Sequence, residues 1–89
     1  MTFYVYVLRS LSTGRLYIGS TEDFRRRLTE HQAGIARYTR GRGPWEVVLV
    51  EELSTRSEAM RRERGLKSGQ GREWIVQQLN GRAGPPQAD

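Results

Sequence analysis

The first hydrophobic run, residues 3–8, is made of aromatic and β-branched residues, and a shorter run at residues 15–19 follows the sequence Ser12-Thr13-Gly14. Aromatic and β-branched residues favour strands, and Ser, Thr and Gly favour turns, so the two runs predict a β-hairpin. Both faces of the first run are apolar, which predicts a central strand in a sheet covered on both sides. Whether Tyr6 and Tyr17 face each other depends on a pairing register that the sequence leaves open.

Residues 22–33 have the signals of a short helix, with Thr21 as the predicted N-cap and Gly34 as the residue that ends it. One face of this helix is unusually polar. Arg27 and His31 share that face with apolar residues, where a plain amphipathic helix would carry more apolar side chains. We expect the neighbouring Arg25 and Arg26 to be solvated, so Arg27 is the informative arginine of the triplet.

The middle of the chain predicts a loop, a strand and a helix. Residues 35–44 combine arginines with glycines and a proline, which predicts a flexible basic loop. Trp45 to Leu53 is rich in Val and predicts a third strand. Thr55-Arg56-Ser57-Glu58 matches a capping box, which starts a second helix at about residue 56.

The C-terminal part predicts one more helix and a tail. Gly69 and Gly71 are expected to bracket the end of the second helix, and a third helix is predicted over residues 72–80. The side chains expected to point inward from this third helix are Trp74, Ile75, Val76 and Leu79. The predicted organisation is a single domain over residues 1–81, followed by a disordered tail over residues 82–89.

Composition excludes several classes of protein. Of the 89 residues, 36% are hydrophobic and 28% are charged, which suits one compact core and does not suit a disordered chain. The absence of Cys excludes disulfides and thiolate zinc sites, so a metal would need oxygen or imidazole ligands. No apolar run reaches the ~18–20 residues of a membrane span and the start does not have the pattern of a signal peptide, so we expect a cytoplasmic protein with no membrane partner.

The formal net charge is +5, and Lys67 is the only lysine among the basic residues. Arginine grips phosphate oxygens with a planar fork of donors, so this composition favours a nucleic-acid partner over a charge that serves only solubility.

Glu63 is the second polar residue in an apolar setting. On the predicted second helix it shares one side with Ala59, Met60, Leu66 and Lys67. A carboxylate there is a salt-bridge partner of a core-edge arginine, an outward-pointing side chain or a functional group. Because the first helix carries a similar anomaly, we interpret the two together as parts of a shared active site.

These segments resemble the GIY-YIG nuclease family over roughly residues 3–68. The second tripeptide of the family name is intact as Tyr17-Ile18-Gly19, and the first is degenerate as Tyr4-Val5-Tyr6, with Tyr4 in the place of Gly. Residues 57–67 are similar to the later helix of the family, whose metal-binding glutamate corresponds to Glu63. The length is similar to that of small stand-alone bacterial members.

The resemblance implies an α/β (α+β) fold with a three-stranded antiparallel sheet flanked by helices, and a metal-dependent DNA endonuclease. Glu63 would bind one Mg²⁺ or Mn²⁺ ion. A tyrosine would be the general base, Tyr6 in preference to Tyr17, and Tyr17 would hydrogen-bond in the same cluster. Arg27 would hold the scissile phosphate, and His31 would orient or deprotonate the attacking group.

A wider set of residues is expected to contact the nucleic acid, which is DNA or, as an alternative, RNA. The set consists of Arg26, Arg37, Tyr38, Arg40, Arg42 and Lys67. Tyr38 could stack on an unpaired base, and a packed loop aromatic is an equal alternative. The two G-x-G patterns, residues 41–43 and 69–71, are interpreted as loops, so no nucleotide cofactor is expected.

Two other functions remain open. A nucleic-acid-binding module of the same fold with little turnover would bind in a salt-dependent manner without help from divalent metal. A protein-interaction domain with an acidic partner would bind no nucleic acid even at low salt.

Overall fold

The strands and helices form an open sheet with helices on both sides, and the computed structural model describes residues 2–36 and 39–83. In chain order the elements are β1 (Phe3–Ser10), β2 (Leu16–Thr21), α1 (Phe24–Gln32), β3 (Trp45–Leu53), α2 (Arg56–Lys67) and α3 (Gly69–Ala83). The three strands are antiparallel in the order β2-β1-β3. This confirms the predicted fold class, and the first hydrophobic run is the central strand, as expected.

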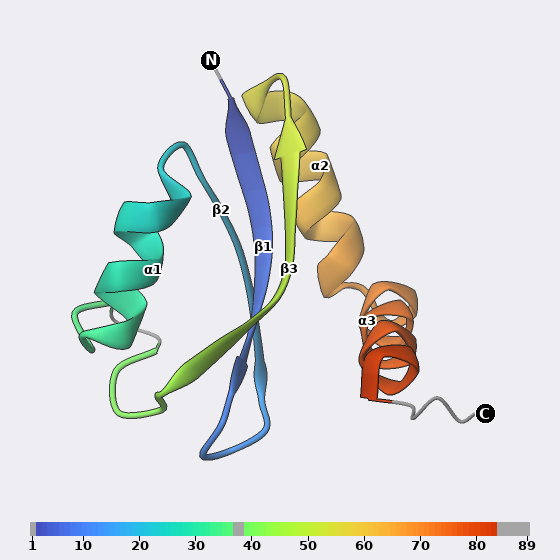
Figure 1. Ribbon diagram of the computed structural model, residues 1–89. Coiled ribbons are helices and arrows are strands. Elements are labelled where there is room, and N and C mark those ends of the chain that lie inside the picture. The colour runs from blue at the N-terminus through green and yellow to red at the C-terminus, as the bar shows by residue number, and fades with distance from the viewer. Residues whose placement is uncertain (1, 37–38, 84–89) are drawn as a thin grey trace.

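Helix α1 covers one face of the sheet, and α2 with α3 cover the other (Figure 1). Strand β1 contributes to both sides because successive side chains of a strand point to opposite faces. Val5 and Val7 belong to the core that α2 and α3 cover, whereas Tyr6 and Leu8 belong to the core that α1 covers. All four side chains are fully buried. Strand β1 is therefore a wall shared by two cores.

Helix α1 begins at Phe24, two residues later than predicted, and its N-cap is Asp23 instead of Thr21. Thr21 is not available as a cap because it is the last residue of β2 and pairs with Tyr4 of β1. The Asp23 carboxylate accepts a hydrogen bond from the backbone N–H of Arg26 at 3.0 Å. The predicted end is confirmed, since Gly34 follows the C-cap with a φ of +76°.

The capping box at the start of α2 is confirmed, with Thr55 and Glu58 bonded reciprocally. The prediction for α3 was wrong at both ends, because this helix runs from Gly69 to Ala83 and the glycines of its first turn are helical. The Ser68 hydroxyl accepts a hydrogen bond from the Gly71 N–H at 3.0 Å, which caps the new helix. Residues 84–89 of the predicted tail lie outside the described residues.

Only part of the predicted inner face of α3 is buried. Ile75 is 1% exposed and Leu79 is half-buried, whereas Trp74 is 36% and Val76 is 46% exposed. Residues 74, 75 and 76 diverge by about 100° each around a helix, so they do not share one face, whereas positions four apart do. Trp74 instead stacks under the Arg62 guanidinium, 5.2 Å from its ring centre.

The basic loop is tied to the β1–β2 hairpin. The Ser10 hydroxyl donates a hydrogen bond to the carbonyl oxygen of Arg42, and the Leu11 N–H donates to the carbonyl oxygen of Pro44 at 2.9 Å. Gly41 has a φ of +75°, a backbone conformation that glycine adopts without strain. In the described part of the loop there is neither strand nor helix, as predicted, and none of the described helices is long and apolar enough to cross a membrane.

Candidate functional site

Tyr6 and Tyr17 lie on the same face of the sheet, under α1. The register pairs Tyr6 with Gly19 and Leu8 with Tyr17, so the two tyrosines are diagonal neighbours on adjacent strands. Their ring centres are 6.2 Å apart. This settles the register that the sequence left open.

His31 of α1 joins the tyrosines and is 1% exposed. Its Nε2 is 2.9 Å from the Tyr6 hydroxyl, and its Nδ1 is 2.7 Å from the Thr39 hydroxyl. The tautomer with hydrogen on Nδ1 donates to Thr39 and accepts from Tyr6, which satisfies both nitrogens of a neutral ring. The Tyr17 ring lies 4.8 Å from the His31 ring, centre to centre. Thr39 had no sequence signal, because its contact with His31 depends on how the basic loop folds back.

Burial controls the protonation of this pair. Burial lowers the pKa of His31, the positive charge of Arg27 lowers it further, and Glu30 acts in the opposite direction. Burial also raises the pKa of Tyr6 well above its usual range, the neighbouring Tyr17 adds to this, and Arg27 opposes it. Tyr6 is therefore a neutral hydroxyl that donates to a neutral His31.

The lowered pKa of His31 predicts that acid destabilises the fold in a defined window. The unfolded chain takes up a proton on His31 as the pH falls through about 6.5, whereas the folded chain resists it, so stability is lost as the pH falls. The slope is at most about 1.4 kcal/mol per pH unit. Urea unfolding between about pH 7 and pH 5 measures it, and His31→Gln should flatten the slope. An equally steep slope in that variant would contradict the assignment to His31.

Gly19 of β2 leaves room for the side chains of Tyr6 and Tyr17. A Cβ atom at this position would lie 2.8 Å from the Tyr6 hydroxyl and 3.1 Å from the Tyr17 ring. Gly19→Ala should therefore push the buried Tyr6 phenol away from His31 and lower the free energy of unfolding by about 1–3 kcal/mol.

Urea or thermal unfolding measures this effect, and Gly65→Ala is the control because its Cβ meets nothing within 4 Å. Gly65 lies within α2, so alanine there should be neutral or slightly stabilising. Equal effects of the two substitutions would mean that steric overlap at Gly19 is not the cause of the destabilisation.

Arg27 completes the cluster on this face, as predicted. Its guanidinium donates to the Glu30 carboxylate at 2.8 Å, and 34% of its side chain is exposed. The Glu30 hydrogen bond raises the pKa of Arg27 above its usual range, burial opposes this, and the phenols of Tyr6 and Tyr17 add to the rise. Glu30 was missed in the sequence, although its position three residues after Arg27 on a helix is a pairing signal.

Glu63 lies on α2, on the opposite face of the sheet. One carboxylate oxygen accepts from the Ser20 hydroxyl and the other from the Lys67 ammonium, each at 2.7 Å. Burial raises the pKa of Glu63, but the bonds from Lys67 and Ser20 outweigh it and hold the pKa below its usual range. With 23% of its side chain exposed, Glu63 is an ionised carboxylate held in a fixed position and not an outward-pointing side chain.

The expected site residues thus form two groups, one on each face of the sheet. Tyr6, Tyr17, Arg27 and His31 come together on the α1 face, whereas Ser20 is paired with Val5 and directs Glu63 to the other face. Among the described residues, no hydrogen bond or ion pair in the structure joins Glu63 to the α1-face group. The structure brings the phenols and Arg27 together, whereas Glu63 lies on the other face of the sheet.

A cavity of about 450 Å³ at the β2 edge borders both groups. We call it the edge hollow; its lining includes Arg15, Tyr17, Arg42, Trp45, Lys67 and Arg72. Tyr17 belongs to the α1-face group, and Lys67 is bonded to Glu63. The edge hollow therefore connects the two groups around the outside of β2.

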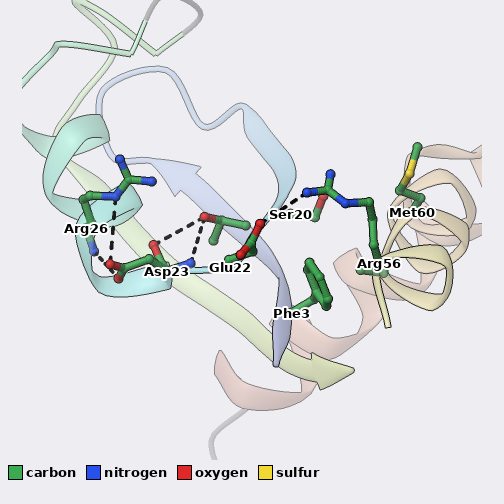
Figure 2. Close-up of a pocket in the computed structure, with 9 residues that line it drawn as sticks. Phe3, Ser20, Glu22, Asp23, Arg26, Arg56 and Met60 are labelled. Carbon is green, nitrogen blue, oxygen red and sulfur yellow. Dashed lines mark hydrogen bonds and ion pairs between the residues drawn. The ribbon is translucent and has the colours of Figure 1, made fainter. Parts of the chain in front are cut away.

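A second cavity, of about 560 Å³, lies near the end of β2 and the start of α1 (Figure 2). Ser20 lines this cavity, but the charged side chains around the cavity pair with one another. Arg56 pairs with Glu22 at 3.2 Å, and Arg26 lies 3.9 Å from the Asp23 carboxylate. This cavity is less suited to an anion than the edge hollow, although it is larger.

The other residues expected to contact nucleic acid are spread around this edge. Arg26 and Arg40 are exposed, and Arg42 and Lys67 line the edge hollow. Arg37 and Tyr38 lie outside the described residues. Of the predicted contact set that the structure describes, Arg42 and Lys67 thus lie at the edge hollow.

Glu63 fits a divalent ion as a single carboxylate ligand. Each of its oxygens accepts one hydrogen bond and retains a lone pair, and Mg²⁺ commonly takes its other ligands from water and phosphate. Within residues 2–36 and 39–83, no group of three His, Cys, Asp or Glu side chains is placed to hold a metal. The donor set therefore fits a weakly held ion that is completed by substrate.

Comparison with known proteins gives consistent results. A family model described as GIY-YIG catalytic domain matches residues 2–79. A UPF0213 protein of Natronomonas pharaonis is 50% identical over 66 residues, which are 73% of this chain and 76% of the relative. A UPF0213 protein of Oceanobacillus iheyensis is 46% identical over 65 residues, or 72% and 74% of the two chains. The solution NMR structure of a UPF0213 protein from Bacillus halodurans matches with a TM-score of 0.56 and 41% identity, over 96% of this chain and 89% of that one.

Proposed function

The chain belongs to the GIY-YIG catalytic domain family, a family of endonucleases, and on this premise we propose that it is a metal-dependent DNA endonuclease that hydrolyses phosphodiester bonds. One observation carries the proposal. The edge hollow, at the free edge of β2, is lined by Tyr17 and by Lys67, and Lys67 is bonded to Glu63. A DNA strand that passes along this hollow would come within reach of the Tyr17 phenol on one side and of the Glu63 carboxylate, which Lys67 holds, on the other.

In this proposal Tyr17 is the general base and Tyr6 is a positioning residue. The preference for Tyr6 that the sequence suggested is reversed, because Tyr6 is fully buried and its hydroxyl is bonded to His31. Tyr17 is only half-buried and lines the hollow. A base must come within hydrogen-bond reach of the water that it deprotonates, and Tyr17 is the phenol that solvent reaches. His31, with both nitrogens bonded, orients the tyrosines.

Arg27 would clamp the scissile phosphate. Its guanidinium has five donors, and the bond to Glu30 leaves others to bind phosphate oxygens and the charge that develops on them. The Tyr17 phenol lies beside the Arg27 guanidinium, so the proton acceptor and the phosphate clamp would be adjacent.

Glu63 would hold the divalent ion, Mg²⁺ or Mn²⁺. When bound, such an ion supplies positive charge that polarises the phosphoryl group and its leaving oxygen. Ser20 and Lys67 orient the carboxylate for this purpose. Arg26, Arg40, Arg42 and Lys67 would contact phosphates of the nucleic acid, DNA or RNA, and Arg37 and Tyr38 remain predicted contacts.

A second candidate is a binding module of the same fold with little turnover. Both oxygens of Glu63 already have partners within the protein, and Tyr4 stands where the family name calls for Gly. In this candidate Lys67 keeps its ion pair with Glu63 when the nucleic acid binds, and divalent metal changes nothing.

The test is a cleavage panel of labelled duplex, flap, branched and single-stranded DNA, with Mg²⁺, with Mn²⁺ and with chelator. The proposal expects cleavage in the presence of metal only, with one phosphate and one hydroxyl at each cut. Salt-dependent binding that is indifferent to metal, with every substrate intact, would support the binding module instead. The absence of any binding at low salt would favour a protein-interaction domain.

A further inference from the structure

The walls of the edge hollow are fixed by bonds from other elements. The amide of Gln32 in α1 donates to the carbonyl oxygen of Trp45 at 2.8 Å and accepts from the Trp45 N–H at 2.9 Å. The hydroxyls of Ser10 and Ser12 both donate to the carbonyl oxygen of Arg42. The basic loop and the start of β3 are therefore held in position where they border the hollow.

Trp45 has an unpaired donor in this wall. Its side chain is 5% exposed, and its indole N–H is the one buried side-chain nitrogen or oxygen in residues 2–36 and 39–83 that has no hydrogen-bond partner. A buried N–H without a partner is destabilising, and the two hydrogen bonds with the Gln32 amide hold the backbone of Trp45 in place. Trp45 lines the hollow, so an acceptor oxygen of a ligand that displaces the atoms covering this N–H would supply the missing partner.

All the charged side chains of the described residues that line the edge hollow are positively charged. Arg15 from the β1–β2 hairpin, Arg42 from the basic loop and Arg72 from α3 line it with Lys67, and none of its described lining residues is acidic. Lys67 is paired with Glu63, and the Arg72 guanidinium donates to the carbonyl oxygen of Lys67 at 3.3 Å. Arg15 and Arg72 make no ion pair with any described residue. Four cations from four separate segments form a site for an anion.

We propose that the edge hollow is a second phosphate subsite, which holds a nucleotide phosphate next to the scissile one, with Arg15 and Arg72 as its main cations and the Trp45 indole N–H as a hydrogen-bond donor. The volume of about 450 Å³ lies within the ~300–1,000 Å³ of ordinary ligand pockets. The proposal rests on the proposed function in taking the anion to be part of the substrate strand. It implies that this strand passes around the free edge of β2.

The first test compares two double variants with the same loss of charge. Arg15→Gln with Arg72→Gln removes the subsite cations, whereas Arg61→Gln with Arg64→Gln removes two exposed arginines of α2 that do not line the hollow. Binding of a fluorescent DNA is measured by anisotropy over a range of salt in the presence of chelator. The subsite holds one phosphate, so loss of both its cations should reduce the slope of log K against log salt by about 0.9, and the second pair should change it by almost nothing. Equal losses in both pairs, or no loss in either, would overturn the proposal.

The second test observes Trp45 directly by NMR. The chain has two tryptophans, so Trp74→Phe assigns the Trp45 indole N–H signal. A short DNA should shift this signal, and inorganic phosphate should shift it at a much higher concentration and be displaced by the DNA. A signal that neither titrant moves would refute the subsite. A shift by phosphate that the DNA does not displace would indicate a free-anion site and would overturn the assignment to the substrate strand.

The two proposals fail separately. Cleavage by the wild-type protein, with unchanged binding in the Arg15 and Arg72 double variant, would leave the endonuclease in place and remove the subsite. Intact DNA in every arm of the cleavage panel, with the expected slope change and indole shift, would leave the subsite in place and remove the endonuclease.

Discussion

Glu63→Gln should reduce metal-dependent cleavage by at least about 100-fold while leaving DNA binding nearly unchanged. Loss of a residue that only supports a metal ligand typically costs 10–100-fold, and loss of the ligand itself should cost more. The amide keeps the size of the side chain and can still accept from the Ser20 hydroxyl. The bond to Lys67 becomes weaker, but a partly exposed ion pair contributes only about 0–1 kcal/mol, so the fold should survive.

Single-turnover cleavage and anisotropy in chelator measure the two effects separately. Glu52→Gln is the matched control, because it removes the same charge from an exposed residue of β3, on the opposite edge of the sheet from β2. It should cleave at the wild-type rate. Undiminished cleavage by the Glu63 variant would refute its assignment as the metal ligand, and equal losses in both variants would point to net charge.

Gly71→Ala should be the most destabilising single substitution considered, with a loss of more than about 3 kcal/mol in the free energy of unfolding. A Cβ atom at Gly71 would lie 2.1 Å from the carbonyl oxygen of Gly65 and 2.6 Å from the Cα of Leu66. These are backbone atoms of α2, so no side-chain rotation relieves the overlap, and the two helices must separate. For a domain of this size the melting temperature should fall by more than about 10 °C.

Gly69→Ala is the control, since its Cβ meets nothing within 4 Å although it lies in the same turn of α3. It should be neutral or stabilise by up to about 1 kcal/mol, because alanine is the better helix former. Thermal unfolding of both variants measures the difference in their melting temperatures. Similar melting temperatures would mean that α3 can move away from α2 at little cost.

The close approach at Gly71 also explains why the third helix was placed wrongly from the sequence. Glycine in a sequence usually marks a turn, and two glycines in three residues predicted a loop. Here position 71 is a glycine inside a helix because α3 has no room for a side chain against α2, and that contact is visible only in three dimensions. The opposite case is the capping box at Thr55, which lies within four residues and was predicted correctly.

The same distinction applies to the site. The polar face of α1 was predicted from helical spacing alone, and the structure places Arg27 and His31 there with the tyrosines. The partners of these residues are another matter. Ser20 contacts Glu63 across 43 residues, and Thr39 reaches His31 only because the basic loop folds back. Short hydroxyl side chains carry no periodic signal that identifies such contacts. Which tyrosine is exposed was equally invisible, since it depends on the order of the strands.

The position of β1 between two cores ties the folding of this protein to its chemistry. A deletion or insertion of one residue within β1 would exchange its two sets of side chains, so that the phenol of Tyr6 would enter the aliphatic layer and Val5 or Val7 would face His31. We therefore expect length changes to be tolerated in the hairpin turn around Gly14, where a Cβ meets nothing within 4 Å, and to be excluded from the strand itself.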